Sequence, residues 1–416
     1  MPEPPPLPAR PAEKAEESPE PEPKSAPPAL APRSQPAEVA APAPEAKASF
    51  PVRAWRKFWS FIDWSMGVLA LICGLAILAV IPVLNFLSLG YLLEVSGRIA
   101  RTGKFKSGWV GIRKASQVGS LVVGTWLVLL PVRLVSDMWK DAEIIESGGP
   151  VAEGWRVGLI VLSVITAIHI AWAALRGGRF RHFLWPAPIK FVKWLGQEGK
   201  FTHVRNGVFG YIRDLRIPYY FWLGFRGFVG AVMWLAIPVL ILFGAAHIPN
   251  DGGSLVVTLI GSFFLMIAAM YLPFMQTHFA MTGKFEALFQ IGVVRQVFRR
   301  APIAFWFSLL ITLLFALPLY LLKIELAPQE VAWLPSLLFV VFIFPARVLV
   351  GWAFSRGLKR EQPRNWFFRW SGRLAAIPVV GAYAFIVWLT QYLSFHGTWS
   401  LLEQHAFLVP APMLGL

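Results

Sequence analysis

The chain consists of long apolar blocks separated by shorter segments rich in charged residues, Gly and Pro. A membrane-spanning helix needs about 20 mostly apolar residues, because the hydrocarbon core is about 30 Å thick and each helical residue rises about 1.5 Å. Several blocks reach this length, and one soluble core could not bury so many of them. The sequence therefore predicts an all-α, multi-pass transmembrane helix bundle with about eight spans. We place the spans at roughly 64–97, 116–136, 156–175, 219–247, 254–281, 302–323, 331–356 and 374–396.

Positive charge is distributed unevenly among the connecting segments. Segments 98–115, 176–218, 282–301 and 347–373 hold 26 Lys and Arg residues, whereas the other connections and the C-terminal tail hold four. Anionic lipids and the membrane potential retain Lys and Arg on the cytoplasmic side. The sequence therefore predicts a cell-membrane protein with its N-terminus and these four segments in the cytoplasm and its C-terminus outside. The same pattern explains the net charge of +16 without nucleic acid as a partner.

The N-terminal segment differs in composition from the rest of the chain. Pro, Ala and Glu occupy 35 of the first 48 positions, and none of these positions is aromatic. Such a segment cannot bury enough apolar surface to offset the entropy of ordering it. We therefore expect a disordered cytoplasmic tail over 1–50, a transmembrane helical domain over 51–400 and a C-terminal tail over 401–416. The single cysteine, Cys73, excludes a disulfide framework within the chain.

An internal similarity relates two distant segments. Residues 91–105 align with residues 271–285 at a constant offset of 180, and seven of the fifteen positions are identical. Both copies end in Thr-Gly-Lys-Phe, in which the Gly can end a helix with a left-handed cap. Four predicted spans separate the copies, which favours a parallel 4+4 internal repeat with halves 51–250 and 251–400. A recurring signal at the start of a loop would explain the match without duplication.

The longest predicted cytoplasmic segment mixes cations with aromatic rings. Phe180–Trp185 and Lys190–Trp194 carry this mixture, which is typical of helices lying in the headgroup layer. We therefore expect interfacial amphipathic helices on the cytoplasmic side and anionic membrane lipids as partners. A belt that only anchors the bundle, without specific lipid recognition, is the simpler alternative. The expected headgroup contacts are Lys104, Arg179, Lys190, Lys193 and Lys284.

The first apolar block contains Pro82-Val-Leu-Asn85, followed by Leu89-Gly-Tyr91. This Pro-x-x-Asn…Gly-Tyr pattern resembles an uncharacterised family of bacterial polytopic membrane proteins, classed as a domain of unknown function. The resemblance covers the first span and the loop that follows it. It implies a bacterial inner membrane and brings no activity with it.

Polar side chains within apolar spans are functional candidates, because lipid does not satisfy them. Counted back from the Gly that ends each odd-numbered span, Glu94, His169 and Arg347 should lie at a similar depth and form one polar layer. Glu94 and Arg347 could pair within it and join the two halves of the repeat. Alternatively, these two residues snorkel separately to the inner interface and His169 hydrogen-bonds a carbonyl. The other intramembrane polar candidates are Asn85, Gln276 and His278.

The chain lacks the motifs of soluble enzymes. It contains no His-Glu-x-x-His, no Gly-x-Ser-x-Gly and no phosphate-binding loop, and its seven His residues are scattered. We therefore expect no catalysis, no cofactor and no metal, and a membrane scaffold or structural component as the function. A small-solute or ion transporter that uses Glu94, His169 and Arg347 is the alternative, and a membrane-embedded lipid-modifying enzyme is the third. The sequence does not indicate an oligomeric state.

Overall fold

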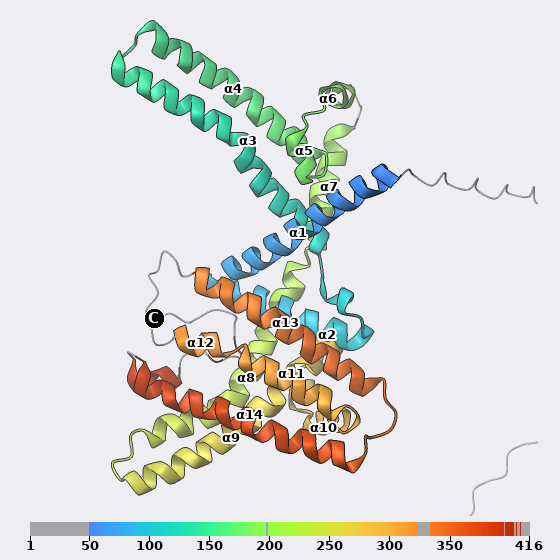
Figure 1. Ribbon diagram of the computed structural model, residues 1–416, viewed down its shortest axis with the longest axis vertical. Coiled ribbons are helices and arrows are strands. Elements are labelled where there is room, and N and C mark those ends of the chain that lie inside the picture. Colours follow the sequence, from blue (N-terminus) through green and yellow to red (C-terminus); the bar gives the residue numbers. More distant parts are fainter. Residues whose placement is uncertain are drawn as a thin grey trace, which may run out of the picture. The chain divides into compact units, whose positions relative to one another are not determined.

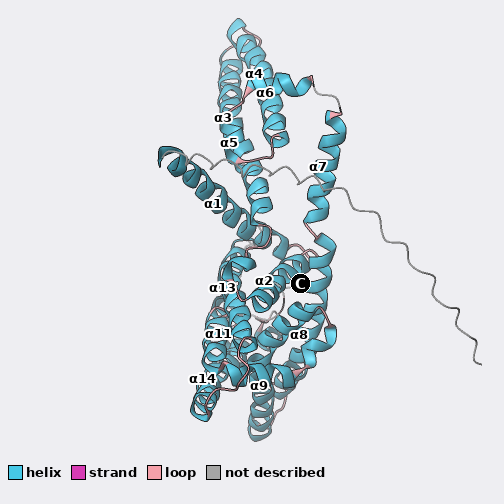
Figure 2. Ribbon diagram, turned by 90° about the vertical axis from the view of Figure 1, so that its right-hand side faces the viewer, coloured by secondary structure: helices cyan, strands magenta, loops and turns pink. Residues whose placement is uncertain are grey.

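In the computed structural model, every regular element of the described chain is a helix (Figures 1 and 2). The described residues are 50–196, 199–322, 333–394, 396–402, 405 and 408. The chain divides into two units, Met1–Arg53 and Ala54–Leu416, and nearly all described residues belong to the second. The predicted N-terminal tail up to residue 49 and most of the predicted C-terminal tail lie outside the described residues.

Among the described residues, seven helical segments are long and apolar enough to cross a membrane, or eight if one pair bent by 114° forms a single span. The chain is therefore a multi-pass helical protein, as predicted. The predicted sixth span, 302–323, contains α11 and α12, whereas α10 precedes it within the segment 282–301. The α-helices are α1 (Phe50–Val80), α2 (Asn85–Thr102), α3 (Ile112–Ile145), α4 (Pro150–Leu175), α5 (Phe180–Leu184), α6 (Pro188–Leu195), α7 (Lys200–Asp214), α8 (Ile217–Ala245), α9 (Asp251–Thr282), α10 (Ile291–Arg300), α11 (Pro302–Leu314), α12 (Leu317–Leu322), α13 (Trp333–Leu358) and α14 (Trp366–Leu393). Short 3-10 helices are η1 (Phe105–Gly108), η2 (Phe285–Phe289) and η4 (Gly397–Leu401).

The first apolar block is not one span, so the prediction of a single helix over 64–97 is wrong. The helix breaks at 81–84, where Pro82 lacks an N–H to continue it and Val83 has a φ of 69°. The Ser88 hydroxyl donates a hydrogen bond of 2.7 Å to the Leu75 carbonyl. In a continuous helix these two residues would lie about 20 Å apart. The chain therefore turns back, and α1 and α2 form an antiparallel hairpin.

α2 lies at the centre of the bundle, in contact with α8, α9 and α13. Almost every side chain from Ser88 to Ala100 is buried, including the polar side chains of Ser88, Glu94 and Ser96. α2 is thus surrounded by protein, which explains how a helix this polar can lie among apolar ones.

Glycines allow the neighbours of α2 to approach its backbone closely. A Cβ atom at Gly90 would collide with the Tyr220 carbonyl of α8, and one at Gly97 with the backbone of α9. On a third side, Gly351 of α13 lies against the backbone of α2. Small residues are the usual means by which membrane helices pack at short distance. These three crossings hold α2 in place.

α3 and α4 form a second helical hairpin with mostly exposed side chains. Gly148, at a φ of 69°, lies in its turn, and Pro150 begins α4. In each helix only 17% of the most apolar window is buried. α5 packs on both helices, and its Phe183 ring lies against Gly124 of α3. The predicted interfacial segments are helical, as α5 and α6, while their place in a headgroup layer stays a prediction.

The two Thr-Gly-Lys-Phe runs adopt the same local structure. α2 and α9 end at Gly103 and Gly283, with φ of 69° and 74°, and each Gly N–H donates to the carbonyl four residues earlier at 2.7 Å. An extended Lys and a 3-10 helix follow in both cases. The copies then diverge, because η1 leads into the 34-residue α3 and η2 into the 10-residue α10. The larger 4+4 repeat stays a prediction.

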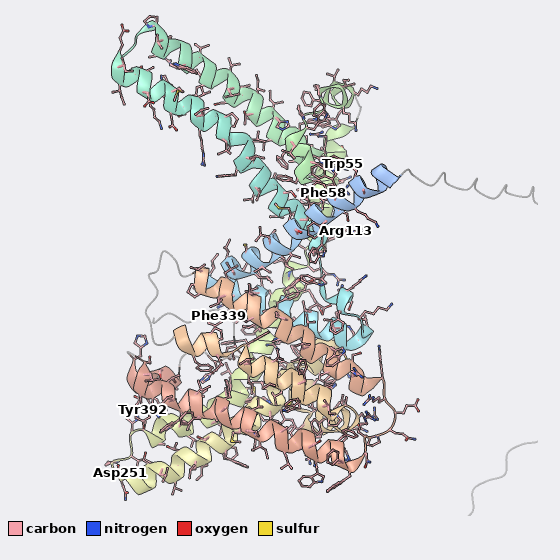
Figure 3. All side chains as sticks on the ribbon, viewed as in Figure 1. Trp55, Phe58, Arg113, Asp251, Phe339 and Tyr392 are labelled. Atoms are coloured by element: carbon pink, nitrogen blue, oxygen red, sulfur yellow. The ribbon has the colours of Figure 1, made fainter. Side chains whose placement is uncertain are left out.

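The bundle has two distinct ends. The C-termini of α2, α9 and α13 meet α10 and the start of α14 at one end (Figure 1). Asp251 at the start of α9 and Tyr392 near the end of α14 lie at the other (Figure 3). The polar side chains described next belong mainly to the first end.

Candidate functional site: the basic end

Glu94 is a buried carboxylate of α2, with 2% of its side chain exposed. Its Oε1 accepts hydrogen bonds from Arg98 Nε at 3.1 Å and from Arg101 Nη2 at 2.9 Å. Its Oε2 accepts a hydrogen bond of 2.8 Å from the Tyr219 hydroxyl of α8. The negative charge is thus neutralised by the same helix that carries it.

Arg101 connects this cluster to the end of α9. Its Nη1 donates to the carbonyls of Ala280 and Met281 at 2.9 and 3.1 Å. Arg226 of α8 donates to the Gly283 carbonyl at 3.2 Å. The last carbonyls of a helix lack partners within it, and positive charge there interacts favourably with the helix dipole. Glu94, Arg101 and Arg226 therefore fasten α2, α8 and α9 together.

Arg347 does not pair with Glu94, so the predicted ion pair is wrong. Glu94 finds its cations at i+4 and i+7 on its own helix. Arg347 is 5% exposed, and its Nη1 is buried without a hydrogen-bond partner. It precedes Gly351, which packs on α2, by one helical turn. Because so little of either side chain is exposed, the alternative in which both snorkel to a surface is also wrong, whereas its other part, a hydrogen bond between His169 and a carbonyl, is confirmed.

His169 belongs to the α3–α4 hairpin. Its Nε2 lies 2.7 Å from the Phe183 carbonyl, and this hydrogen bond joins α4 to α5. Within the described part of the chain, no hydrogen bond or ion pair joins any two of Glu94, His169 and Arg347. The predicted polar layer is therefore not a connected network.

Of the remaining intramembrane candidates, two lie in α9 and the third lies at the start of α2. Gln276 and His278 are buried in α9, and the His278 ring stacks on Phe354 of α13 with centroids 5.8 Å apart. Asn85 begins α2, and its Oδ1 is buried without a hydrogen-bond partner. His278 thus belongs to the contact between α9 and α13, and Asn85 to the turn after α1.

The five predicted headgroup contacts are all exposed. Lys104 and Lys284 follow the glycines that end α2 and α9, whereas the other three lie at the start of α5 and within α6. Lys284 has an acidic neighbour, with 3.9 Å between its Nζ and Glu286 Oε1. The exposed cations are Lys104, Arg179, Lys190, Lys193 and Lys284.

A larger cationic cluster lies where α10, α13 and α14 meet. Arg360 Nη1 donates to the Arg300 carbonyl at 3.1 Å, and the Arg364 N–H donates to the Arg299 carbonyl at 2.9 Å. Burial, together with the charges of Arg364 and Arg356, lowers the pKa of Arg360. Like charges are therefore crowded here. We call this surface the basic end and define it by Lys104, Lys284, Arg295, Arg299, Arg300, Arg356, Lys359, Arg360, Arg364 and Arg373.

These arginines contribute to the predicted topology, but they are not among the site residues predicted from the sequence. The signal that could have found them lies in α10. Val294 and Val297 of this helix are buried, whereas Arg295 and Arg299 are exposed. That spacing is typical of an amphipathic helix with one cationic face.

Comparison of the chain with protein-family models, with curated proteins and with solved structures finds no match.

Proposed function

We propose that the protein is a non-enzymatic membrane scaffold whose basic end binds anionic lipid headgroups at the cytoplasmic face. The charge balance of the basic end carries this proposal. Ten Lys and Arg residues define this surface, and the segments 98–115, 282–301 and 356–373 that hold them contain two acids, Glu286 and Glu361. Each Lys or Arg near an anionic membrane surface contributes about 1 kcal/mol of attraction.

The α1–α2 hairpin supports the orientation. The eight single spans predicted from the sequence would put the N-terminus and the first basic segment on opposite sides of the membrane and both chain ends on the same side. They therefore do not fit the orientation that the charges predict. Because α2 returns along α1, the start of α1 and the turn after α2 can share one side. We therefore place the N-terminus, the basic end and the segment 176–218 in the cytoplasm and the C-terminus outside, in a bacterial inner membrane. The resemblance of the first block to an uncharacterised bacterial family fits this location and stays a prediction.

Cysteine labelling tests the orientation. In a chain with Cys73→Ala, a single cysteine is placed either at Ser147, in the turn of the α3–α4 hairpin, or at Glu286, beside the basic end; both residues are exposed. A membrane-impermeant maleimide added to intact cells should label the first position only. Labelling of the second from outside would reverse the orientation and remove the basic end from the cytoplasm.

Lipid-dependent stability tests the function. The purified protein in a neutral detergent should unfold at a higher temperature after addition of phosphatidylglycerol, but not after phosphatidylcholine with the same chains. The difference should shrink at high salt, because exposed charges more than a Debye length apart are screened. Equal stabilisation by both lipids would contradict the proposal.

Arg347 supports transport as a second candidate. A buried arginine with an unpartnered Nη1 in a candidate span is costly, and such residues commonly mark ion or solute pathways. A transporter that used it would move an anionic solute. Liposomes containing the protein should then show an anion flux that Arg347→Leu abolishes. Identical fluxes from the two proteins and from empty liposomes would exclude this candidate.

A further inference from the structure

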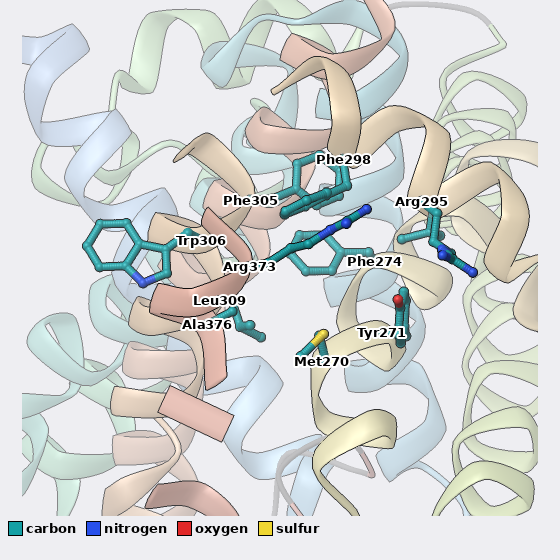
Figure 4. A pocket seen from close by; sticks show the side chains of 11 residues that line it. Met270, Tyr271, Phe274, Arg295, Phe298, Phe305, Trp306, Leu309, Arg373 and Ala376 are labelled. Carbon is teal, nitrogen blue, oxygen red and sulfur yellow. The ribbon is translucent and has the colours of Figure 1, made fainter. Parts of the chain in front are cut away.

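A groove lies beside the basic end, between α9, α10, α11 and α14 (Figure 4). Its walls are largely aromatic. The rings of Phe274 and Phe305 stack with centroids 4.4 Å apart, and Phe298 meets Phe305 edge-on at 5.8 Å. The indole N–H of Trp306 donates to the Ala375 carbonyl at 3.0 Å and ties α11 to α14 along the groove. The groove is therefore built from four helices that other contacts hold in place.

Two arginines enter this apolar groove from different helices. Arg295 comes from α10, and Arg373 comes from α14 with its guanidinium over the Phe298 ring, 5.9 Å from the centroid. Figure 4 shows the Arg373 side chain extending past the phenylalanines toward Arg295. Within the described residues, neither arginine forms an ion pair with a carboxylate. Two guanidinium groups without a carboxylate partner among the described residues therefore line the same groove as the aromatic and aliphatic side chains.

The groove is polar at one side and apolar at the other. Both arginines lie on the side of Phe298, whereas Met270, Leu309 and Ala376 line the opposite side (Figure 4). Arg373 is about 10 Å along α14 from its start at the basic end, and Met270 is about 18 Å along α9 from its end there. With the basic end at the headgroup layer, as proposed above, the groove runs from that layer toward the hydrocarbon.

We propose that this groove binds one anionic phospholipid, with its phosphate between Arg295 and Arg373 and an acyl chain along the apolar side. Guanidinium groups bind phosphate oxygens through paired, charge-assisted hydrogen bonds. A free phosphate would leave the aromatic walls uncovered. A choline headgroup would add a positive charge to a surface that already carries ten Lys and Arg residues. This inference rests on the proposed function, which by itself requires only that anionic headgroups gather on the basic end as a whole.

Native mass spectrometry of the full chain in detergent tests the groove, because it resolves individual bound lipids. Dioleoyl phosphatidylglycerol is compared with dioleoyl phosphatidylcholine, with dihexanoyl phosphatidylglycerol and with glycerol phosphate. The wild-type protein should bind a first dioleoyl phosphatidylglycerol more tightly than any of the other three. The double variant Arg295→Gln/Arg373→Gln should bind this lipid at least about tenfold more weakly, which corresponds to about 1.4 kcal/mol.

The matched control is Arg299→Gln/Arg364→Gln, which removes the same charge from α10 and from the loop before α14 without touching the groove. Its affinity should stay within about threefold of wild type, because screening weakens exposed charges that do not contact the lipid. Equal losses of lipid affinity in the two double variants would contradict binding in the groove and leave the proposed function in place. Glycerol phosphate binding as tightly as the long-chain lipid would overturn the lipid as occupant. A wild-type protein without preference for phosphatidylglycerol would overturn both proposals.

Discussion

α2 and the α3–α4 hairpin differ in composition and in how deeply they are buried. α2 carries Glu94, Arg98 and Arg101 within 18 residues, yet it lies at the centre of the bundle. α3 and α4 are apolar over long stretches, yet most of their surface is exposed. The difference follows from what each environment can satisfy: protein neighbours can bond polar groups, whereas lipid cannot. Hydropathy therefore indicates which helices can face lipid, and it does not indicate which helix lies in the middle.

The largest expected difference in stability is between two glycine substitutions, one in α2 and one in the α3–α4 hairpin. Gly90→Ala should destabilise the protein by roughly 1–3 kcal/mol or more, because its methyl group would collide with the Tyr220 carbonyl. Gly158→Ala in α4 meets nothing within 4 Å and should leave stability unchanged or raise it by up to about 1 kcal/mol. Unfolding by a denaturing detergent, followed by far-UV circular dichroism, measures both. Equal changes in the two variants would show that α2 is not packed as described.

Removing a carboxylate charge should lower the stability of the protein clearly in α2 and hardly at all in the α3–α4 hairpin. Glu94→Gln weakens three charge-assisted hydrogen bonds around a buried group and should cost roughly 1.5–3 kcal/mol, toward the lower value because both arginines can be rehydrated. Glu153→Gln breaks an exposed pair with Arg156, whose atoms are 3.2 Å apart, and should cost about 0–1 kcal/mol. The same unfolding assay compares them. A cost at Glu153 as large as at Glu94 would contradict the comparison.

A smaller and local effect is expected at His169. His169→Leu removes the hydrogen bond between α4 and the Phe183 carbonyl, which should cost roughly 0.5–1.5 kcal/mol. Because the bond lies within the hairpin, hydrogen–deuterium exchange should rise in α5 and remain unchanged in α2. Faster exchange in α2 would mean that the hairpin and the bundle centre unfold together.

The smallest expected effect is a coupling near zero. Glu94 and Arg347 have no hydrogen bond or ion pair in common, so the stability losses of Glu94→Gln and Arg347→Leu should add within about 0.5 kcal/mol. A double-mutant cycle at fixed pH and salt measures the coupling free energy between the two residues. If the double variant were more stable than the sum of the two losses predicts, Glu94 and Arg347 would have to interact, which would contradict the structure.

Helical spans could be predicted from the sequence because their cause is local. A run of apolar residues must satisfy its own backbone hydrogen bonds, and only a helix does so within one segment. The glycine caps of the two Thr-Gly-Lys-Phe runs are equally local, because a left-handed residue at a helix end needs no distant partner. The candidate residues Glu94 and Arg347 were found for the same reason, since any charged residue inside an apolar block stands out.

The fold-back of the first block could not be read from the sequence. Pro82 ends a helix, but Pro238 and Pro273 lie inside the continuous helices α8 and α9. A proline therefore permits a break without requiring one. Whether the chain turns depends on the packing that follows, and here α2 is buried among three other helices.

The sequence by itself determined that this protein is helical and carries spans of membrane length, together with the segments in which its positive charge is concentrated. Only the tertiary structure decided that the most polar helix lies at the centre, that Glu94 binds its own helix rather than α13, and that Arg295 and Arg373 share an aromatic groove. The physical reason is the range of the interactions. Hydrophobicity and helix capping act over a few neighbouring residues, whereas the burial of a helix and the meeting of two arginines in one groove depend on contacts between segments far apart in the chain.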